Sequence, residues 1–354
     1  MIKPTKMRSL DRSSHAQPEI NRTVQTTIDN FTSMETPIQH EGHIDPIKSS
    51  SNTRFLILNP RGLNPWNNYR TEMLLESCEK LQIDSLLLSE TQVKWTAPNI
   101  NKMESRLKKL GREILVIGAD SNQWEINRNE YLPGGLMAAF VGECRALISE
   151  EETHKGKLGN WMAIKLKHHN KTLIVITTHR LPSSSSNGPT CSLTQCNLVD
   201  GKAKTTTEHR KEFFHQIKMC LQGLDEALDV IIAGDFNQNI ASNEVQSFFR
   251  DIGAQDAHSI CNNVQLNQMD KTYIRSSSPI DSVALSSGIM DYVEGVKLLS
   301  QNEIVMSDHR SYAIDIKLEE YFEDQFSLWN PHNRTILNPS RQSHRTIFYE
   351  ELER

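Results

Sequence analysis

The sequence predicts an α/β fold, arranged as a four-layer α/β sandwich in which two packed mixed β-sheets are flanked by helices. Many short apolar runs recur between residues 54 and 318, whereas long helical patterns are few. An apolar strand, a helix and a second apolar strand follow one another between residues 55 and 89, which is typical of a parallel βαβ unit. Many strands with few long helices favour two sheets covered by helices over one doubly wound sheet.

The expected strands are short apolar runs, and the expected helices have apolar residues at helical spacing. The strand runs are FLIL (55–58), SLLLS (85–89), ILVIG (114–118), GLMAAFVG (135–142), WMAIKL (161–166), TLIVITT (172–178), DVIIAG (229–234) and SYAIDIKL (311–318). The helices are YRTEMLLESCEKLQ (69–82) and EHRKEFFHQIKMCLQGL (208–224). A long loop rich in Ser and Thr occupies residues 181–207, and loops of that length in a compact domain are usually functional or mobile.

Composition divides the chain into three segments. Residues 1–53 are polar, contain almost no aromatic residues, and balance six basic against six acidic side chains. Such a segment buries too little apolar surface to offset its ordering entropy, so we expect it to be disordered. Residues 54–318 are expected to form the folded domain, and residues 319–354 a polar linker or tail.

Charge and cysteine content limit the class of protein. The formal net charge is −5, whereas a protein that coats DNA would be basic overall, so any nucleic-acid contact must be local. Six scattered cysteines without a secretory signal favour reduced thiols in an intracellular protein, with nucleus and cytoplasm not distinguished. No run approaches the roughly 18 apolar residues of a membrane span, so we expect a soluble protein without a membrane partner.

Polar side chains stand at the ends of several predicted strands. They are Asn59 after FLIL, Glu90 after SLLLS, Asp235 and Asn237 in the GDFN that follows DVIIA, and Asp308 with His309 in MSDHR before the last strand. A single Asp or Asn at a strand end more often caps a turn than carries chemistry. Their recurrence at several strand ends indicates a functional site.

Six short segments between residues 54 and 318 contain most of these polar residues, and their order along the chain is informative. They are LNPRGL, LLLSETQ, the PGG of YLPGGL, IIAGDFN, KTY with the IDSV that follows it, and MSDHRSYAIDI. In this order they resemble the endonuclease/exonuclease/phosphatase family, which includes pancreatic DNase, apurinic/apyrimidinic endonucleases and retrotransposon endonucleases. SET, GDFN and SDH together are a specific signal, whereas any one of them would be weak. The resemblance implies a DNase-like fold and Mg²⁺-dependent hydrolysis of a phosphodiester.

The resemblance also implies roles for the matched residues. Glu90 matches the main metal-binding carboxylate, with Asn59 and Asp308 around the same Mg²⁺, which Mn²⁺ would be able to replace. Mg²⁺ prefers carboxylates, water and substrate phosphate as ligands. Asp235 matches the residue that positions and deprotonates the attacking water, and Asn237 would hydrogen-bond a phosphate oxygen or Asp235.

Two histidines complete the expected site. His309 matches the residue that contacts the scissile phosphate, and Asp281, in IDSV, matches the Asp that fixes its tautomer and favours its charged form. His179 stands in THRLP, where many family members have a tyrosine that reaches the phosphate. A histidine can donate a hydrogen bond and carry charge, so activity would survive with an altered pH dependence. The alternative is that His179 is only a loop residue.

The segment from THRLP to EHRKEFF resembles endonuclease domains of non-LTR retrotransposons, which nick target DNA so that the new 3′-hydroxyl primes reverse transcription. This implies a DNA substrate, a 3′-hydroxyl and 5′-phosphate product, and a reverse transcriptase of the same element as a partner. Residues 319–354 resemble the linker before a polymerase. Two alternatives stay open: a phosphatase or phosphodiesterase of the same fold acting on inositol phosphates or lipids, and a catalytically inactive nucleic-acid-binding scaffold.

Basic residues that could meet phosphate groups gather in one helix-like stretch, which also carries Glu104. They are Lys102, Arg106, Lys108, Lys109 and Arg112, with Arg61 and Arg310 elsewhere in the chain. A run of charges is usually a solvated face, so DNA contact there stays one of two interpretations. Phosphate contacts would give affinity without sequence preference.

Overall fold

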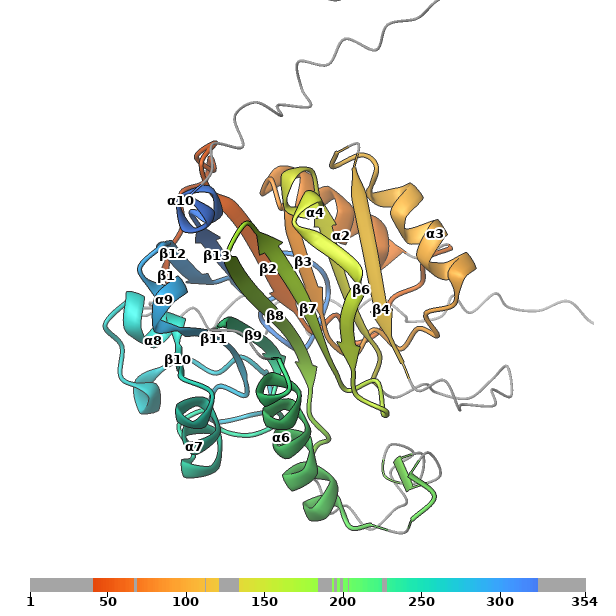
Figure 1. Cartoon of the computed structure of the whole chain (residues 1–354), viewed down its shortest axis with the longest axis vertical. Coiled ribbons are helices and arrows are strands. Elements are labelled where there is room, and N and C mark those ends of the chain that lie inside the picture. Colours follow the sequence, from red (N-terminus) through yellow and green to blue (C-terminus); the bar gives the residue numbers. More distant parts are fainter. Residues whose placement is uncertain are drawn as a thin grey trace, which may run out of the picture. The chain divides into compact units, whose positions relative to one another are not determined.

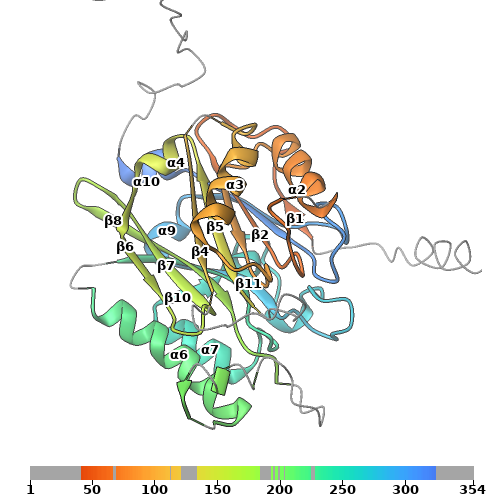
Figure 2. The ribbon, with the colours of Figure 1, turned by 90° about the vertical axis from the view of Figure 1, so that its right-hand side faces the viewer.

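The computed structural model describes residues 41–66, 69–111, 113–120, 134–183, 193, 196–197, 200–202, 204–224 and 228–323. Within them, two β-sheets pack face to face and helices cover their outer faces (Figures 1 and 2). The four-layer α/β sandwich expected from the sequence is therefore confirmed. The disorder expected for residues 1–40 and the tail expected at 324–354 lie outside the described residues.

In the described part of the chain, the first sheet has seven strands in the order β1-β12-β13-β2-β3-β5-β4. These are β1 (Gly42–His43), β2 (Thr53–Leu58), β3 (Ser85–Leu88), β4 (Ile114–Ala119), β5 (Leu136–Val141), β12 (Val293–Leu298) and β13 (Tyr312–Ile316). Strands β2 and β3 are parallel and are connected by helix α2 (Tyr69–Lys80), which is the predicted βαβ unit. The other neighbouring strands in this sheet are antiparallel.

Among the residues that the structure describes, the second sheet has six strands in the order β10-β11-β9-β8-β7-β6. These are β6 (Ile148–Lys155), β7 (Trp161–His168), β8 (Lys171–His179), β9 (Asp229–Asp235), β10 (Ala254–Asp256) and β11 (Asp281–Ser286). Asp235 pairs with His179 on the parallel neighbour β8 and with Asp281 on the antiparallel neighbour β11. The register alone thus brings three of the predicted site residues to one end of this sheet.

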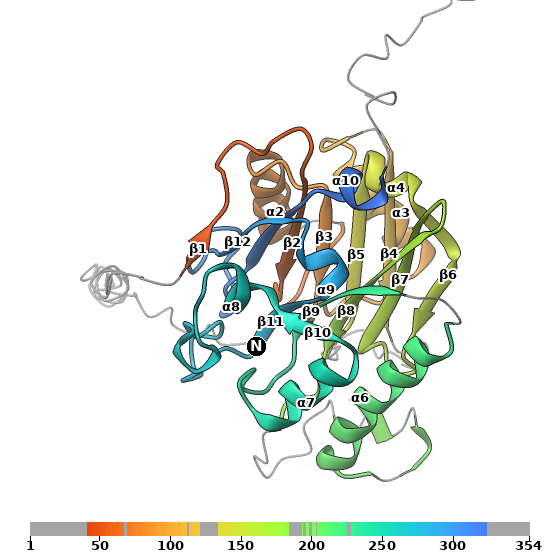
Figure 3. The ribbon, with the colours of Figure 1, turned by 60° about the vertical axis from the view of Figure 1, so that its left-hand side comes forward.

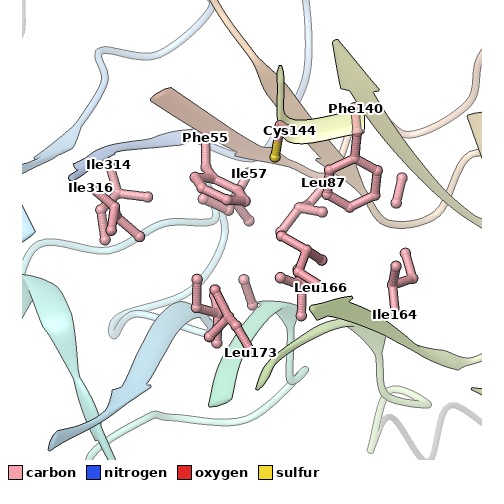
Figure 4. Close-up of a cluster of buried hydrophobic side chains, with 14 of the residues drawn as sticks. Phe55, Ile57, Leu87, Phe140, Cys144, Ile164, Leu166, Leu173, Ile314 and Ile316 are labelled. Atoms are coloured by element: carbon pink, nitrogen blue, oxygen red, sulfur yellow. The ribbon is translucent and has the colours of Figure 1, made fainter. Parts of the chain in front are cut away.

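Alternating side chains of each strand serve two different cores, because successive residues of a strand point to opposite faces. Phe55 and Ile57 of β2 lie between the sheets, opposite Leu166 and Leu173 of the second sheet (Figure 4). The intervening Leu56 packs on the outer side with α2 and α3 (Ala97–Leu107). Burial on both faces explains why the central strands read as continuous apolar runs.

Helices α6 (Thr206–Gln222) and α7 (Asn243–Asp251) cover the outer face of the second sheet (Figure 3). A capping box begins α6: the Thr205 side chain accepts from the Glu208 amide while the Glu208 side chain accepts from the Thr205 amide. Phe214 stacks on Phe248 of α7. Short helices are α4 (Glu143–Ala146), α8 (Ala257–Cys261), α9 (Ser287–Met290) and α10 (Leu318–Phe322), with a 3₁₀ turn at Leu266–Gln268. Among the described helices, none is long and apolar enough to cross a membrane.

The folded domain extends past both limits expected from the sequence, residues 54 and 318. Strand β1 pairs with β12, and Ile44 is 8% exposed, so residues from 41 onward belong to the domain. At the other end α10 places Tyr321 and Phe322 in the core between the sheets. A two-residue strand and a one-turn helix are too short to leave a periodic signal in the sequence, which is why both were missed.

Candidate active site

Side chains from both sheets meet at one end of the sandwich. Asn59, directly after β2, donates from Nδ2 to Glu90 Oε2 at 3.0 Å and to Asp235 Oδ2 at 3.1 Å. Asp235 is the last residue of β9 in the other sheet, and both it and Asn59 are 1% exposed. A single buried amide therefore connects the ends of the two sheets and holds two carboxylates beside each other.

His309 lies in the same cluster and is buried. Its Nδ1 is 2.9 Å from Asp281 Oδ2, and its Nε2 is 3.4 Å from Asn59 Nδ2 and 3.9 Å from Asp235 Oδ2. The Tyr273 ring lies against the imidazole, with centroids 4.8 Å apart, and the two residues form a backbone bridge. The imidazole is thus fixed on both sides, with Nε2 directed toward the Asp235 carboxylate.

The loop before β11 is held by a threonine that the sequence did not single out for a role. Thr272 Oγ1 accepts hydrogen bonds from the backbone amides of Ile280 and Asp281, both at 3.0 Å. Thr272 follows Lys271 in the KTY motif, so the motif was the signal that marked it. Its hydroxyl fixes the place of the carboxylate that orients His309.

Burial and neighbouring charges shift the pKa values of Asp235 and His309. Burial raises the pKa of Asp235 to about 8, with a further increase from the Asp281 charge and a decrease from His309. Burial alone would lower the pKa of His309, but the carboxylates of Asp281, Asp235 and Asp308 together raise it to about 10. The carboxylates around His309 therefore favour its charged form, and burial makes Asp235 a stronger proton acceptor than an exposed carboxylate once it is ionised.

Glu90 sits in a turn that Gly134 and Gly135 build together with the SETQ segment. Glu90 has a φ of 48°, in the left-handed region that costs free energy for any residue but glycine. The turn is held by hydrogen bonds that the backbone amides of Thr91 and Gln92 donate to the carbonyls of Gly135 and Gly134, at 3.0 and 2.9 Å. A Cβ on Gly135 would come within 2.8 Å of the Thr91 hydroxyl, so the glycine permits this close approach. The Gln92 side chain donates to Glu90 Oε1 at 3.2 Å, a contact that sequence reasoning missed.

His179 and Asn237 lie beside the cluster, with different orientations. His179 Nε2 is 4.0 Å from Glu90 Oε2, and burial lowers the pKa of the imidazole although the Glu90 charge opposes this. His179 is thus at the site and not merely in a loop. Asn237 turns its side-chain amide to the carbonyl of Arg180 at 2.8 Å, while its backbone amide donates to Asp235 Oδ1 at 2.7 Å.

Asp308 lies at the rim, paired with a cation. Arg61 Nη1 donates to Asp308 Oδ2 at 2.6 Å, and the Arg61 side chain is 53% exposed. The other carboxylate oxygen, Oδ1, is buried without a hydrogen-bond partner among the described residues. A buried carboxylate oxygen is costly unless a donor or cation compensates it.

The donor set of this site suits a hard divalent cation. Ligand atoms of Glu90, His179 and Asp235 lie within 4.8 Å of one another, as do those of Asp235, Asp281 and His309. Carboxylate and amide oxygens are the ligands that Mg²⁺ and Mn²⁺ take in proteins. The partnerless oxygen of Asp308 belongs to neither of these groups but adds a further oxygen at the rim.

Comparison with known proteins identifies the fold. No protein-family model and no curated protein sequence matches this chain. Among solved structures, an AP endonuclease from Leishmania major is 14% identical, with a TM-score of 0.54 over 77% of this chain and 89% of that chain. The human Nocturnin catalytic domain is 15% identical, with a TM-score of 0.52 over 79% and 98%. An endonuclease/exonuclease/phosphatase from Bacteroides vulgatus is 14% identical, with a TM-score of 0.50 over 75% and 98%.

At these identities the likeness concerns the fold. The chain has the DNase-like fold of endonuclease/exonuclease/phosphatase proteins, as the sequence motifs predicted.

Proposed function

We propose that this chain is a Mg²⁺-dependent endonuclease that hydrolyses a DNA phosphodiester bond and leaves a 3′-hydroxyl and a 5′-phosphate. The observation that carries this is the cluster shared by the two sheets. In it Asp235, held by Asn59, lies 3.9 Å from the ring nitrogen of His309, whose other nitrogen is on Asp281. A buried proton acceptor beside a buried cationic donor suits the attack of water on a phosphate ester.

Each residue of the cluster has a role in this proposal. Asp235 accepts the proton of the attacking water, and its raised pKa strengthens it as a base once it is ionised. His309 donates from Nε2 to an oxygen of the scissile phosphate and adds positive charge there. Asp281 keeps the other proton on Nδ1 and so holds the tautomer and the charge. Asn237 holds Asp235 through its backbone amide.

Glu90 would hold the metal ion together with Asp308, and Mn²⁺ would be able to replace Mg²⁺. Asn59 would join them through Oδ1, which in this structure accepts a hydrogen bond from the Arg61 amide at 2.9 Å. When bound, the cation supplies positive charge that offsets the charge gathering on the phosphate in the transition state. His179 stands next to Glu90 and would donate a hydrogen bond to the phosphate where many related enzymes use a tyrosine. Because burial lowers its pKa, His179 would do so as a neutral imidazole.

The choice of DNA rests on the sequence motifs, since proteins named as an AP endonuclease and as Nocturnin share this fold. The segment around THRLP favours nicking of target DNA for a retroelement, with the reverse transcriptase of that element as the partner. Such an enzyme would work inside the cell.

Nicking of supercoiled plasmid tests the proposal. The parent should relax the plasmid with Mg²⁺ and stay inactive after chelation, and Asp235→Asn should be inactive in both conditions. The nicked product should then serve as a primer for a DNA polymerase, since a 3′-phosphate would block extension.

Two other outcomes point to the remaining alternatives. A phosphatase of this fold would leave the plasmid closed and release inorganic phosphate from inositol phosphates or lipids. An inactive scaffold would retard DNA in a gel without cutting it. Either result would contradict the proposed endonuclease.

A further inference from the structure

Two large aromatic side chains stand exposed a few residues after Asn59. Trp66 is 58% exposed, and Tyr69, the first residue of α2, is 71% exposed. Trp66 lies in the connection that leads from Asn59, after β2, to α2, and Tyr69 begins that helix. Exposure of an indole to water is unfavourable, and exposed aromatic rings often mark binding surfaces.

The Trp66 ring is fixed although it is exposed. Its Nε1 donates to Asn99 Oδ1 of α3 at 2.6 Å, and its backbone amide donates to Asn64 Oδ1 at 2.9 Å. The ammonium group of Lys102, also on α3, lies 5.5 Å from the ring centroid. A ring held in place before a ligand arrives loses little conformational entropy on binding.

The same connection is joined to the turn that carries Glu90. The amide of Gly62 donates to the Glu90 carbonyl at 2.9 Å, and the amide of Leu63 donates to the Thr91 carbonyl at 2.8 Å. The segment that presents Trp66 is therefore hydrogen-bonded to the segment that presents the main candidate metal ligand. A strand whose phosphate lies at Glu90 would pass close to this surface.

Two arginines bond to the backbone of the same connection. Arg70 donates to the Arg61 carbonyl at 2.9 Å, and Arg106 donates to the Pro65 carbonyl at 2.9 Å. The acidic Glu72 is there as well and is paired with Arg106. Aromatic faces with cations beside them are the surface on which single-stranded nucleic acids bind, because bases stack on the rings and phosphates meet the cations.

We propose that Trp66, Tyr69 and Lys102 form a stacking surface for an unpaired nucleotide next to the scissile phosphate. The base would stack on the indole, and Lys102 would meet the adjoining phosphate. A base inside a duplex already has both faces stacked, so this surface favours DNA that is frayed, gapped or single-stranded at the cut. This inference rests on the proposed function, because it assumes that the bound strand is the one cleaved.

Binding without cleavage tests the surface directly. In the presence of a chelator, the full chain should bind a duplex with a short unpaired segment about 10-fold more tightly than a fully paired duplex, as expected for one stacked base. Trp66→Ala should abolish this preference, and Trp66→Phe should keep most of it. Met219→Ala, which removes another exposed side chain on α6, should have no effect.

Two further measurements separate stacking from charge. Binding of the gapped duplex should quench tryptophan emission, and Trp66→Phe should remove that quenching. Lys102→Gln should weaken binding to both duplexes and reduce the salt dependence by about one phosphate contact. Lys218→Gln, at a lysine paired with Asp251 away from this surface, should do neither.

The outcomes distinguish this inference from the proposed function. If the parent nicks plasmid but Trp66→Ala keeps the full preference for the gapped duplex, the stacking surface is wrong and the endonuclease stands. If the preference depends on Trp66 but no metal-dependent cleavage occurs, the surface stands and the endonuclease is wrong. If the parent binds fully paired and gapped duplexes with equal affinity, the inference is wrong. Unchanged unfolding temperatures of the variants would show that the fold is intact.

Discussion

Two clusters in this molecule combine the same side-chain types but differ in charge balance. At the strand ends, Asp235, Asp281 and His309 bring their ligand atoms within 4.8 Å of one another. Before and within α6, Asp200, His209 and Glu212 do the same. Residue types and distances alone would make both of them candidate metal sites.

A lysine separates the two cases. Lys204 Nζ lies 2.6 Å from Asp200 Oδ2 and also contacts Glu212, so the second cluster already has its cation. At the strand ends the carboxylates outnumber the nearby cations, and Asp308 Oδ1 has no partner among the described residues. The charge balance around each cluster therefore separates two groups that residue types and distances alone would treat alike.

The largest expected effect concerns the histidines of the two clusters. His309→Ala should lower single-turnover nicking by at least the ~100-fold typical of losing one transition-state donor. Asp281→Ala should do less, because the imidazole remains but loses its fixed tautomer. The double variant should lose less than the sum of the two, since both changes disable one unit. His209→Ala should leave turnover unchanged, and strict additivity of the first pair would show that Asp281 acts separately.

A smaller effect is expected from the carboxylates. Glu90→Gln should raise the Mg²⁺ concentration needed for half-maximal nicking by about 10-fold or more, with partial recovery at high Mg²⁺ or with Mn²⁺. A carboxylate binds a hard cation more strongly than an amide does. Glu212→Gln is the matched control in the neutralised cluster and should not change the requirement. If Glu90→Gln cuts like the parent at limiting Mg²⁺, Glu90 is not the ligand.

Substitution of Arg61 should lower the metal concentration that the protein requires, whereas substitution of Glu90 should raise it. The Arg61 guanidinium is bound to Asp308 and would compete with a metal ion for that carboxylate. Arg61→Gln should therefore lower the Mn²⁺ concentration that stabilises the protein against heat by about 3-fold, a size set by the modest strength of exposed ion pairs. Thermal unfolding at increasing Mn²⁺ measures this without any turnover. An unchanged or higher requirement would mean that the two do not compete.

The smallest expected effect is at Lys204. Lys204→Met should leave nicking unchanged and lower the unfolding temperature by about 2 °C, as expected for loss of a weak ion pair. The vacated carboxylates should then respond to Mn²⁺, so the variant should gain more thermal stability from the ion than the parent does. Equal stabilisation of variant and parent by Mn²⁺ would show that Lys204 does not keep the ion from these carboxylates.

Strands β8 and β9 were predictable from the sequence because they are buried on both faces, whereas the equally buried β11 was not expected as a strand. TLIVITT and DVIIAG carry apolar residues without interruption, and β8 and β9 lie in the middle of the second sheet. The edge strand β6, ISEEETHK, was missed because its sequence is polar almost throughout. Strand β12, VEGVKL, was also missed, because only some of its residues are buried and polar residues interrupt its apolar ones.

The site was predictable where motif order carried it and unpredictable where turn geometry decided it. The expected group of Asn59, Glu90, Asp235, Asp281 and His309 lies together, although their catalytic roles stay predictions. The orientation of Asn237 depends on a positive φ of 48°, which no pattern of residue types indicates. The pairing of Arg61 with Asp308 joins residues far apart in the chain, so only the fold reveals it.

The hydrogen bond from Asn59 to Asp235 makes the geometry of the site depend on how the two sheets pack. One partner belongs to the first sheet and the other to the second, so the reactive groups stay aligned only while the two sheets keep their positions against each other. A displacement of about 1 Å is enough to cost an enzyme much of its rate. The apolar layer around Phe55 and Leu166 thus sets the distance between the two sheets and with it the alignment of the site. For the proposed endonuclease, conservative substitutions in that layer are expected to lower activity before they unfold the protein.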